Sequence, residues 1–267
     1  MPEGPEVKRV VDFLSKFDGC FLHDVEILSG RYSRHGPFSG FYDLKKFLPL
    51  KILNVNCHGK FIYFYFSNDA SLWCTLGMSG AWLNHRRKHS RVRLKINDSD
   101  VWFDDVRNFG TLKFVTDMSL LAKKLSKLGH DPLKRELDCP HFKEVIKKKK
   151  KKTIAQVLMD QSVVAGVGNY LKAEILYASG VSPHRTCESL TDKELGRICK
   201  HTNQIMHTSY NSGGATILTY KDENGIPGSF SRRFMVYNQK QDLLGNEVIR
   251  ETTKDKRTTH WVPKVQM

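Results

Sequence analysis

The hydrophobic period of the chain changes once along its length, and this change restricts the possible folds more than any other feature. Between residues 21 and 115, stretches rich in β-branched and aromatic residues are separated by breaks that mostly contain Gly, Asn, Asp or Ser. These stretches are FLHDVEIL, LKILNVNCHGKFIYFYF, SLWCTLGMSG, HSRVRLKI, DVWFDDV and GTLKFV. Several short strands at such spacing are typical of an antiparallel sandwich or barrel. A short helix is expected before them, in VKRVVDFLSKF.

From about Leu120 onward, apolar residues recur at steps of three and four, which is the period of a helix. The helical stretches are SLLAKKLSKLG, HFKEVI, TIAQVLMDQ, NYLKAEILYASG and TDKELGRICKHTNQIMHTSY. Thr191, with Glu194 three residues later, fits a capping box at the start of the last helix. After Asn211, Gly-rich turns and the extended pieces RRFMVYNQ, NEVIRET and RTTHWVP indicate a small β-hairpin.

These patterns predict an α+β multidomain chain of 267 residues. An antiparallel β-sandwich with flanking helices is expected over residues 1–130, a helical domain over residues 131–212, and the hairpin segment over residues 213–267.

The charge balance favours a polyanionic partner. Forty-three Lys and Arg residues stand against 28 Asp and Glu residues, which gives a formal net charge of +15. Such an excess is common in nucleic-acid binders, although a basic surface that only confers solubility is the alternative. The lysine run at 147–152 is expected to form an exposed loop or a frayed helix end, since like charges repel. Within the run, Lys151 and Lys152 are candidate phosphate contacts.

Two further patterns bound the class of protein. No stretch approaches the roughly 18 apolar residues of a membrane span, and the first residues lack the apolar core of a secretory signal. A soluble intracellular protein is therefore expected, with no membrane partner and with nucleus or cytoplasm left open. A monomer is expected because no heptad run or large apolar surface stripe is evident. The six cysteines show no CxxC spacing, so we expect free thiols rather than disulfides or a metal site. They are Cys20, Cys57, Cys74, Cys139, Cys187 and Cys199.

The first residues, MPEGPEV, combine a proline with two carboxylates. If Met1 is removed, Pro2 presents a secondary amine, and an α-amino group with a pKa near about 8 is partly neutral at pH 7. Its addition to a sugar C1′ gives an iminium ion that acidifies the neighbouring C2′ hydrogen, so strand cleavage by elimination follows. Glu3 is then placed to protonate or stabilise the opening ring, and Glu6 to orient the amine. A flexible acidic terminus is the alternative interpretation.

With these residues in view, the sequence resembles the Fpg/Nei family of DNA glycosylase/AP lyases from end to end. PEGPEV matches the family's N-terminal signature, which implies that Pro2 is the Schiff-base nucleophile and Glu3 the catalytic acid. HGKF resembles the hairpin with the family's lysine, here Lys60, which contacts phosphate and assists elimination. TLGMSG and DVRNFG resemble the loops whose side chains fill the gap left by an everted base; these side chains would be Met78, Arg107 and Phe109. His89, in KHSRVRL, matches a DNA-contacting histidine.

The helical region carries a long match of its own. LMDQSVVAGVGNYLKAEILYASGVSPHR is similar throughout to the family's helix–two-turn–helix motif. The resemblance implies that Asn169 and the backbone around Gly166 and Gly168 bind phosphates beside the abasic position. Glycines that open a helix allow close backbone approach, and the helix N-terminus attracts anions.

The C-terminal segment departs from the family's usual four-cysteine zinc finger. The four ligand positions hold Gln241, Leu244, Val262 and Val265, and none of these side chains is a useful Zn²⁺ ligand. The segment resembles the zincless finger of some endonuclease VIII-like proteins, in which the two valines would hold the hairpin by packing. Arg257 falls where the family's finger arginine reaches the lesion's phosphate and assists the second elimination.

The resemblance implies a bifunctional glycosylase/AP lyase of base excision repair, with damaged DNA as partner and no cofactor. The zincless segment favours oxidised pyrimidines and hydantoins as substrates. The alternative is an enzyme for formamidopyrimidine and 8-oxoguanine, since LTYKDENGIPGSFSRRF has a length compatible with a lesion-capping loop. A non-catalytic damaged-DNA-binding module is a hypothesis from another class, and it would gain weight if Met1 were retained.

Overall fold

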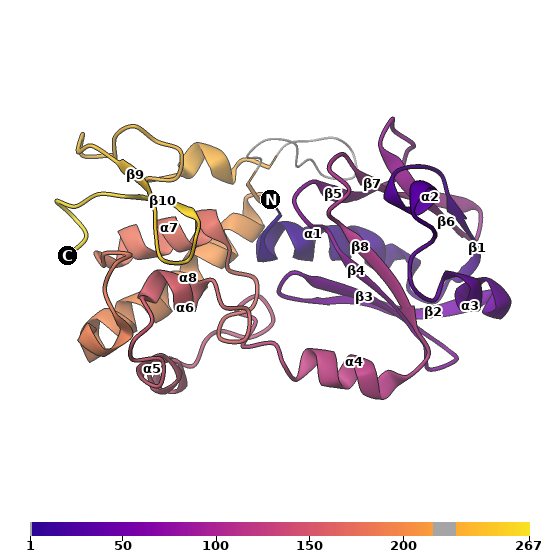
Figure 1. The fold of residues 1–267 in the computed structure, drawn as a ribbon, viewed down its shortest axis with the longest axis horizontal. Helices are drawn as coiled ribbons and strands as arrows, with labels where there is room; N and C mark the ends of the chain where they lie inside the picture. The colour runs from indigo at the N-terminus through magenta and orange to yellow at the C-terminus, as the bar shows by residue number, and fades with distance from the viewer. Residues whose placement is uncertain (1, 216–227) are drawn as a thin grey trace. The chain divides into compact units, whose positions relative to one another are not determined.

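The fold consists of two compact units. A computed structural model describes residues 2–215 and 228–267 (Figure 1). One unit contains Pro2, Glu6–Lys127 and the described residues of 213–229, and the other contains Glu3–Pro5, Leu128–Ser212 and Phe230–Met267. The chain therefore changes from one unit to the other several times, and Glu3 belongs with the helical unit although Pro2 and Glu6 belong with the sheet.

The first unit is built on an antiparallel sheet of eight strands in the order β5-β7-β6-β1-β2-β3-β4-β8. The strands are β1 (Phe21–Ile27), β2 (Leu50–His58), β3 (Phe61–Phe66), β4 (Ser71–Thr75), β5 (Gly80–Leu83), β6 (Ser90–Ile96), β7 (Ser99–Asp105) and β8 (Thr111–Val115). Only two residue pairs join β1 to β2, and the ring of Phe64 in β3 contacts the ring of Trp82 in β5 at 5.7 Å. Because these strands lie in different halves of the order, the two halves face each other, and the predicted sandwich is confirmed.

The helices of this unit are α1 (Gly4–Leu14), α2 (Arg31–Arg34), α3 (Phe41–Phe47) and α4 (Met118–Leu125), with a 3₁₀ turn η1 (Ser15–Phe17) after α1. Helix α1 places Val7, Val10, Val11 and Leu14 in the core, which is the three- and four-residue spacing of one helix face. The sequence did not predict α2, α3 or β5. Helices α2 and α3 have four and seven residues, at most two turns, and β5 has four residues, so none of them shows a clear hydrophobic period.

The second unit is helical and ends in a hairpin. Its elements are α5 (Cys139–Lys147), α6 (Ile154–Leu158), α7 (Asn169–Ser179), η2 (Cys187–Ser189), α8 (Asp192–Asn211), η3 (Phe230–Arg233), β9 (Ile249–Thr252) and β10 (Thr258–Trp261). The predicted capping box of Thr191 and Glu194 is present at the start of α8. The hairpin prediction is confirmed by the antiparallel pair β9 and β10.

The prediction that RRFMVYNQ is extended is wrong, because the segment forms η3 and turns. The backbone N–H groups of Met235, Val236 and Tyr237 donate to the carboxylate of Glu174 at 2.8, 3.1 and 2.8 Å. Burial raises the pKa of Glu174, although these three hydrogen bonds oppose the change. A buried side chain therefore satisfies the donors that a neighbouring strand would otherwise have satisfied.

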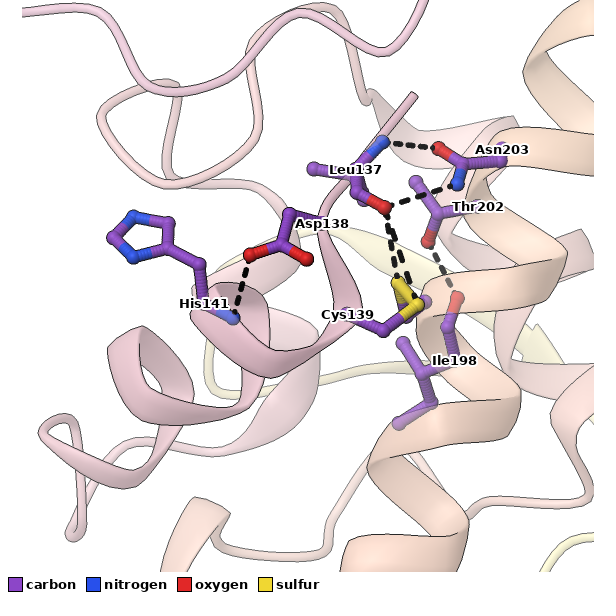
Figure 2. The surroundings of a disulfide bond; sticks show 8 residues. Leu137, Asp138, Cys139, His141, Ile198, Thr202 and Asn203 are labelled. Atoms are coloured by element: carbon purple, nitrogen blue, oxygen red, sulfur yellow. Dashed lines mark hydrogen bonds between the residues drawn. A yellow bond between two sulfur atoms is a disulfide. The ribbon is translucent and has the colours of Figure 1, made fainter. Parts of the chain in front are cut away.

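The prediction of six free thiols is wrong for two of them, because Cys139 and Cys199 form a disulfide (Figure 2). It joins the first residue of α5 to α8, with 5.7 Å between the two Cα atoms. The amide side chain of Asn203 holds the adjacent turn, since it accepts from the N–H of Leu137 (2.8 Å) and donates to its carbonyl (3.4 Å). The two cysteines are 60 residues apart, so only the packing of the helices brings them together.

The lysine run lies at a helix end, as predicted. Lys147 is the last residue of α5, and the lysines that follow form turns. Most of the segment at 218–234 that was considered as a lesion-capping loop lies outside the described residues. No helix in the described part of the chain has the length and apolar character needed to cross a bilayer.

Candidate active site

The carboxylate of Glu3 is buried at the start of helix α7. Its Oε1 accepts from the backbone N–H of Tyr170 at 3.0 Å, and its Oε2 accepts from the N–H of Leu171 at 3.3 Å. N–H groups in the first turn of a helix have no partner within the helix, and the helix dipole favours a negative charge there. Glu3 is therefore fixed in orientation. This also restricts the position of Pro2, the residue directly before Glu3, because consecutive Cα atoms are about 3.8 Å apart.

Two glycines before α7 make this arrangement possible. A Cβ at Gly168 would lie 2.2 Å from Cδ of Glu3, so no larger residue leaves room for the carboxylate. Gly166 has a φ of +96°, which a side chain would disfavour, and its carbonyl accepts from the N–H of Gly4 at 2.9 Å. The amide of Gln161 accepts from the N–H of Gly166 at 3.0 Å and closes the turn.

Glu6 is also buried and also binds backbone, but in the first unit. Its Oε1 accepts from the N–H of Ala215 at 2.7 Å, and a Cβ at Gly214 would lie 2.8 Å from the same oxygen. Glu6 therefore fixes the backbone immediately before residue 216.

Two loops of the sheet carry the three predicted gap-filling side chains. Loop 76–79 joins β4 to β5 and contains the half-buried Met78, and loop 106–110 joins β7 to β8 and contains the exposed Arg107 and Phe109. The Arg107 guanidinium carbon lies 5.0 Å from the centre of the Phe109 ring. We refer to residues 76–79 and 106–110 as the two-loop cluster.

Asp105 holds the two-loop cluster together. Its Oδ1 accepts from the hydroxyl of Ser79 at 2.5 Å and from the N–H of Arg107 at 3.2 Å, and its Oδ2 accepts from the N–H of Gly110 at 2.7 Å. A Cβ at Gly77, whose φ is +58°, would lie 2.6 Å from the backbone of the second loop. The loops therefore contact closely, and Met78, Arg107 and Phe109 are presented by one connected piece of backbone.

Lys60 lies at the same end of the sheet. Phe61 pairs with Thr75, and Thr75 pairs with Thr111, so the turn before β3 and both loops of the cluster leave the sheet together. His89 immediately precedes β6, and its Nδ1 lies 3.2 Å from a terminal nitrogen of Arg91.

In the second unit, Asn169 and Arg257 meet through the hairpin. The side-chain N–H of Asn169, the first residue of α7, donates to the carbonyl of Thr258 at 2.8 Å. Arg257 is exposed in the turn just before that residue. The structure thus brings the predicted phosphate ligand of α7 beside the predicted finger arginine.

A buried ion pair fixes the same turn to α7. The ammonium of Lys172 contacts Asp255 at 2.5 Å and donates to the hydroxyl of Thr259 at 2.8 Å, and both charged side chains are almost fully buried. Burial favours a raised pKa for Asp255, but the Lys172 ammonium and the Thr253 hydroxyl outweigh it and lower the pKa. The Asp255 carboxylate is therefore ionised, and its Oδ1 also accepts from the N–H of Arg257 at 3.3 Å.

Comparison with known proteins shows the family of this chain. Three descriptions match the sequence: the formamidopyrimidine-DNA glycosylase N-terminal domain over residues 1–112, the H2TH domain over 128–221 and the C-terminal domain over 230–267. The formamidopyrimidine-DNA glycosylase of Prochlorococcus marinus is 31% identical over 286 residues and covers 100% of both chains. This chain belongs to the formamidopyrimidine-DNA glycosylase family. Members of the family are DNA glycosylases with AP lyase activity, and this glycosylase is an enzyme of that class.

Two solved structures of Lactococcus lactis enzymes of the same family show how closely the fold is shared. One is a variant bound to DNA that contains Fapy-dG; it has a TM-score of 0.87 with 27% identity and covers 100% of both chains. The other is the wild-type enzyme bound to DNA that contains an oxidised pyrimidine; it has a TM-score of 0.85 with the same identity and coverage.

The C-terminal hairpin of this glycosylase has no cysteine at Gln241, Leu244, Val262 and Val265, the four positions compared above with the zinc ligands of the family. Val262 is fully buried in a small cluster, and Val265 packs against that cluster, whereas Gln241 and Leu244 are exposed. The buried partners of Val262 are Ala173, Val236 and Val248. The two valines thus contribute apolar packing to the hairpin, whereas Gln241 and Leu244 do not.

The lysine run of the glycosylase keeps its charges at the surface. Lys151 and Lys152 are exposed, and the ammonium of Lys152 lies 3.7 Å from the carboxylate of Asp160.

Several residues that organise the site were not predicted from the sequence. Asp105 and Asp255 each stand two residues before an arginine of the site, so the repeated Asp-x-Arg pattern was an available signal. Arg91 is buried and donates to the carbonyl of Asp105 at 2.7 Å, and Lys172 lies inside the motif quoted for α7. A buried Arg or Lys has no distinct sequence signal of its own, because these residues are mostly exposed.

Proposed function

We propose that this glycosylase removes oxidised bases and then cleaves the strand through a Schiff base on Pro2. The observation that carries the proposal is the anchorage of Glu3 on the free N–H groups of α7, which fixes the residue directly after the proposed nucleophile.

The proposed reaction needs only groups of the chain and water. Loss of Met1 exposes the nitrogen of Pro2, whose lone pair forms a bond to C1′ while the bond to the damaged base breaks and the base departs with a proton. Glu3 assists the opening of the deoxyribose ring, and the sugar becomes an iminium ion on the proline nitrogen. Loss of a C2′ proton to solvent breaks the C3′–O bond, and loss of a C4′ proton breaks the C5′–O bond, so each phosphate departs with the electron pair of its bond. Water then hydrolyses the Schiff base, which releases the unsaturated sugar, restores the amine of Pro2 and leaves a one-nucleotide gap with phosphate at both ends.

The other site residues serve DNA binding in this proposal. Phosphates near the lesion are held by Lys60, Asn169 and Arg257 and by the backbone around Gly166 and Gly168, and His89 contacts the DNA. Lys151 and Lys152 add non-specific attraction. Met78 and Phe109 stack in the vacancy of the everted nucleotide, and Arg107 hydrogen-bonds the unpaired base. Lys60 and Arg257 also assist the eliminations, and Glu6 positions the chain around the first turn of α1.

For the lesion, a formamidopyrimidine is the first candidate. The curated relatives carry that name, and one structural neighbour binds Fapy-dG. An oxidised pyrimidine is the second candidate, because the finger lacks cysteine ligands and because another neighbour binds such a lesion.

Borohydride trapping on abasic-site DNA tests the nucleophile. The wild-type chain without Met1 is expected to form a covalent adduct, and Pro2→Thr is expected to lose it while fluorescence anisotropy shows retained binding to DNA with an abasic analogue. Pro5→Ala, a second proline of the same segment, is the matched control and is expected to keep the adduct. An adduct that survives in Pro2→Thr would move the nucleophile elsewhere, and binding without any adduct in the wild type would indicate a non-catalytic module.

A lesion panel decides the substrate. Excision from duplexes that contain Fapy-dG, 8-oxoguanine opposite cytosine, or thymine glycol is measured under single-turnover conditions. Faster excision of Fapy-dG supports the first candidate, and faster excision of thymine glycol supports the second.

A further inference from the structure

A cavity of about 570 Å³ lies on the first unit, against strands β3, β4 and β8. These strands are neighbours at one edge of the eight-stranded sheet (Figure 1). The strand register places two rows of side chains on one face of these strands, namely Tyr63–Trp73–Lys113 and Phe61–Thr75–Thr111. All but Tyr63 line the cavity, together with Lys124 of α4 and residues of the segment between Arg31 and Ser39. The volume is in the range of small-molecule sites.

Aromatic rings form one wall of the cavity. The rings of Phe61 and Trp73 meet edge to face, with 5.4 Å between their centres. The indole N–H of Trp73 donates to the hydroxyl of Ser71 at 2.8 Å, so the polar edge of this half-buried ring is already satisfied. A planar apolar ligand therefore finds a rigid surface on which to stack.

Four basic side chains lie around this wall, namely Arg31, His35, Lys113 and Lys124, and no Asp or Glu lines the cavity. The Lys113 ammonium lies 5.5 Å from the centre of the Trp73 ring, and the Lys124 ammonium lies 5.5 Å from that of Phe61. Within residues 2–215 and 228–267, none of the four basic groups forms an ion pair with a carboxylate.

The cavity therefore combines a flat aromatic surface with positive charge that the described carboxylates do not neutralise. Cys74 is among the lining residues, and burial raises its pKa to about 12, so its thiol stays neutral and adds no opposing charge. A neutral aromatic ligand would leave the charges unused, and a simple anion would leave the rings unused.

We propose that this cavity binds a nucleoside phosphate, with its base stacked on Trp73 and its phosphate held by Lys113 and Lys124. Base stacking on aromatic side chains and phosphate contact by lysine are the two general means of binding single-stranded nucleic acid.

The place of the cavity in the chain identifies the source of this nucleotide. Along the backbone, Thr75 lies three residues before Met78, and Thr111 lies two residues after Phe109. Both threonines line the cavity, so its edge lies within about 11 Å of these two residues of the two-loop cluster. Under the proposed function, the cluster enters the DNA at the lesion. The occupant of the cavity is then an unpaired nucleotide of the DNA strand that lies beside the two-loop cluster. DNA with unpaired nucleotides near the lesion is therefore the favoured substrate.

Isothermal titration with dAMP tests the nucleotide site without any lesion. Lys113→Glu/Lys124→Glu is expected to weaken binding at least tenfold, whereas the control Lys51→Glu/Lys123→Glu keeps the wild-type affinity within twofold. The control carries the same charge change on exposed residues outside the cavity, and Lys123 is the direct neighbour of Lys124. Equal losses in both variants, or no saturable binding by the wild type, would overturn the proposal.

The ring is tested separately. Trp73→Phe is expected to retain most of the dAMP affinity, and Trp73→Leu to lose it, when both variants unfold at the wild-type temperature. Equal affinity of the two variants would contradict stacking. If Trp73→Leu does not fold, the lysine variants still decide the question, because their side chains are exposed.

Two DNA substrates distinguish the sources of the nucleotide. Both contain an abasic analogue, and one also has unpaired nucleotides beside it. The wild type is expected to bind the second several-fold more tightly, and Lys113→Glu/Lys124→Glu to lose this preference more than the control does. If dAMP binding depends on the cavity but the preference does not, the occupant is a free nucleotide and the assignment to a DNA strand is wrong. Failure of borohydride trapping would instead reject the proposed function and leave the dAMP result intact.

Discussion

Arg107 and Arg257, the two arginines that the sequence predicts to contact DNA, lie in turns with similar backbone hydrogen bonds. The interactions that stabilise the two turns differ. Arg107 and Arg257 are both exposed, and each donates its backbone N–H to an aspartate two residues earlier, at 3.2 Å and 3.3 Å. In the two-loop cluster, the other oxygen of that aspartate binds a neutral N–H group, whereas in the hairpin it binds the buried ammonium of Lys172. The first turn is thus held by hydrogen bonds alone, and the second also by a buried ion pair. Substitution of the aspartate is therefore expected to reduce the free energy of unfolding by different amounts in the two turns.

The largest effect is expected from Asp255→Asn. The change leaves the Lys172 ammonium buried without its counter-charge, and breaking a buried pair costs roughly 3–5 kcal/mol. Urea unfolding of the full chain measures the loss, with Asp43→Asn, which breaks an exposed pair with Lys46, as the control near zero. The double variant Lys172→Met/Asp255→Leu is expected to recover most of the stability. A single variant as stable as the control would show that the pair does not support the hairpin.

The next effect is a loss of hairpin stability in acid. His260 is buried, neither ring nitrogen has a partner in the described part of the chain, and burial lowers its pKa to about 4. Because the unfolded chain binds the proton below about pH 6.5, this contribution is complete above that pH and is lost as the pH falls toward 4. The loss is at most about 3 kcal/mol. Urea midpoints between pH 7 and 4 should fall less steeply for His260→Phe than for the wild type; parallel curves would assign the acid sensitivity to other groups.

A smaller effect is expected from Asp105→Asn in the two-loop cluster. An amide accepts at one oxygen only and turns its own N–H₂ toward the N–H of Gly110 or the hydroxyl of Ser79. The unsatisfied donors cost about 1–3 kcal/mol, and affinity for DNA with an abasic analogue falls roughly tenfold as the loops separate. Calorimetry and anisotropy measure the two losses. A stability loss as large as that of Asp255→Asn would remove the distinction between the two turns.

The smallest effect separates what the two arginines contact. If Arg257 binds a phosphate, Arg257→Ala lowers the slope of log K against log salt by about 0.9. If Arg107 binds a base, Arg107→Ala weakens binding but changes that slope less. Anisotropy titrations at salt concentrations between about 50 and 200 mM measure the slopes of both variants. Equal slope changes would mean that both arginines contact the backbone of the DNA.

The same two turns show what the sequence can and cannot reveal. Strand and helix periods predicted the sandwich, all helices except α2 and α3, and the hairpin, and motifs identified Arg107 and Arg257. Asp105 and Asp255 were missed because an acid before an arginine looks like an ordinary surface pair, and only the fold shows that both carboxylates turn inward onto backbone. The Cys139–Cys199 disulfide was missed for a related reason, since 60 residues separate its ends and only helix packing joins them.

Under the proposed function, in which the nitrogen of Pro2 is the nucleophile, the anchorage of Glu3 also determines how the protein must be produced. The N–H groups of Tyr170 and Leu171 leave the start of the chain no slack, so anything added before Pro2 is held at the same spot. A purification tag at that end turns the proline nitrogen into an amide without a usable lone pair. Expression vectors should therefore carry the tag after Met267, whose side chain is exposed, or use a protease that leaves Pro2 as the first residue.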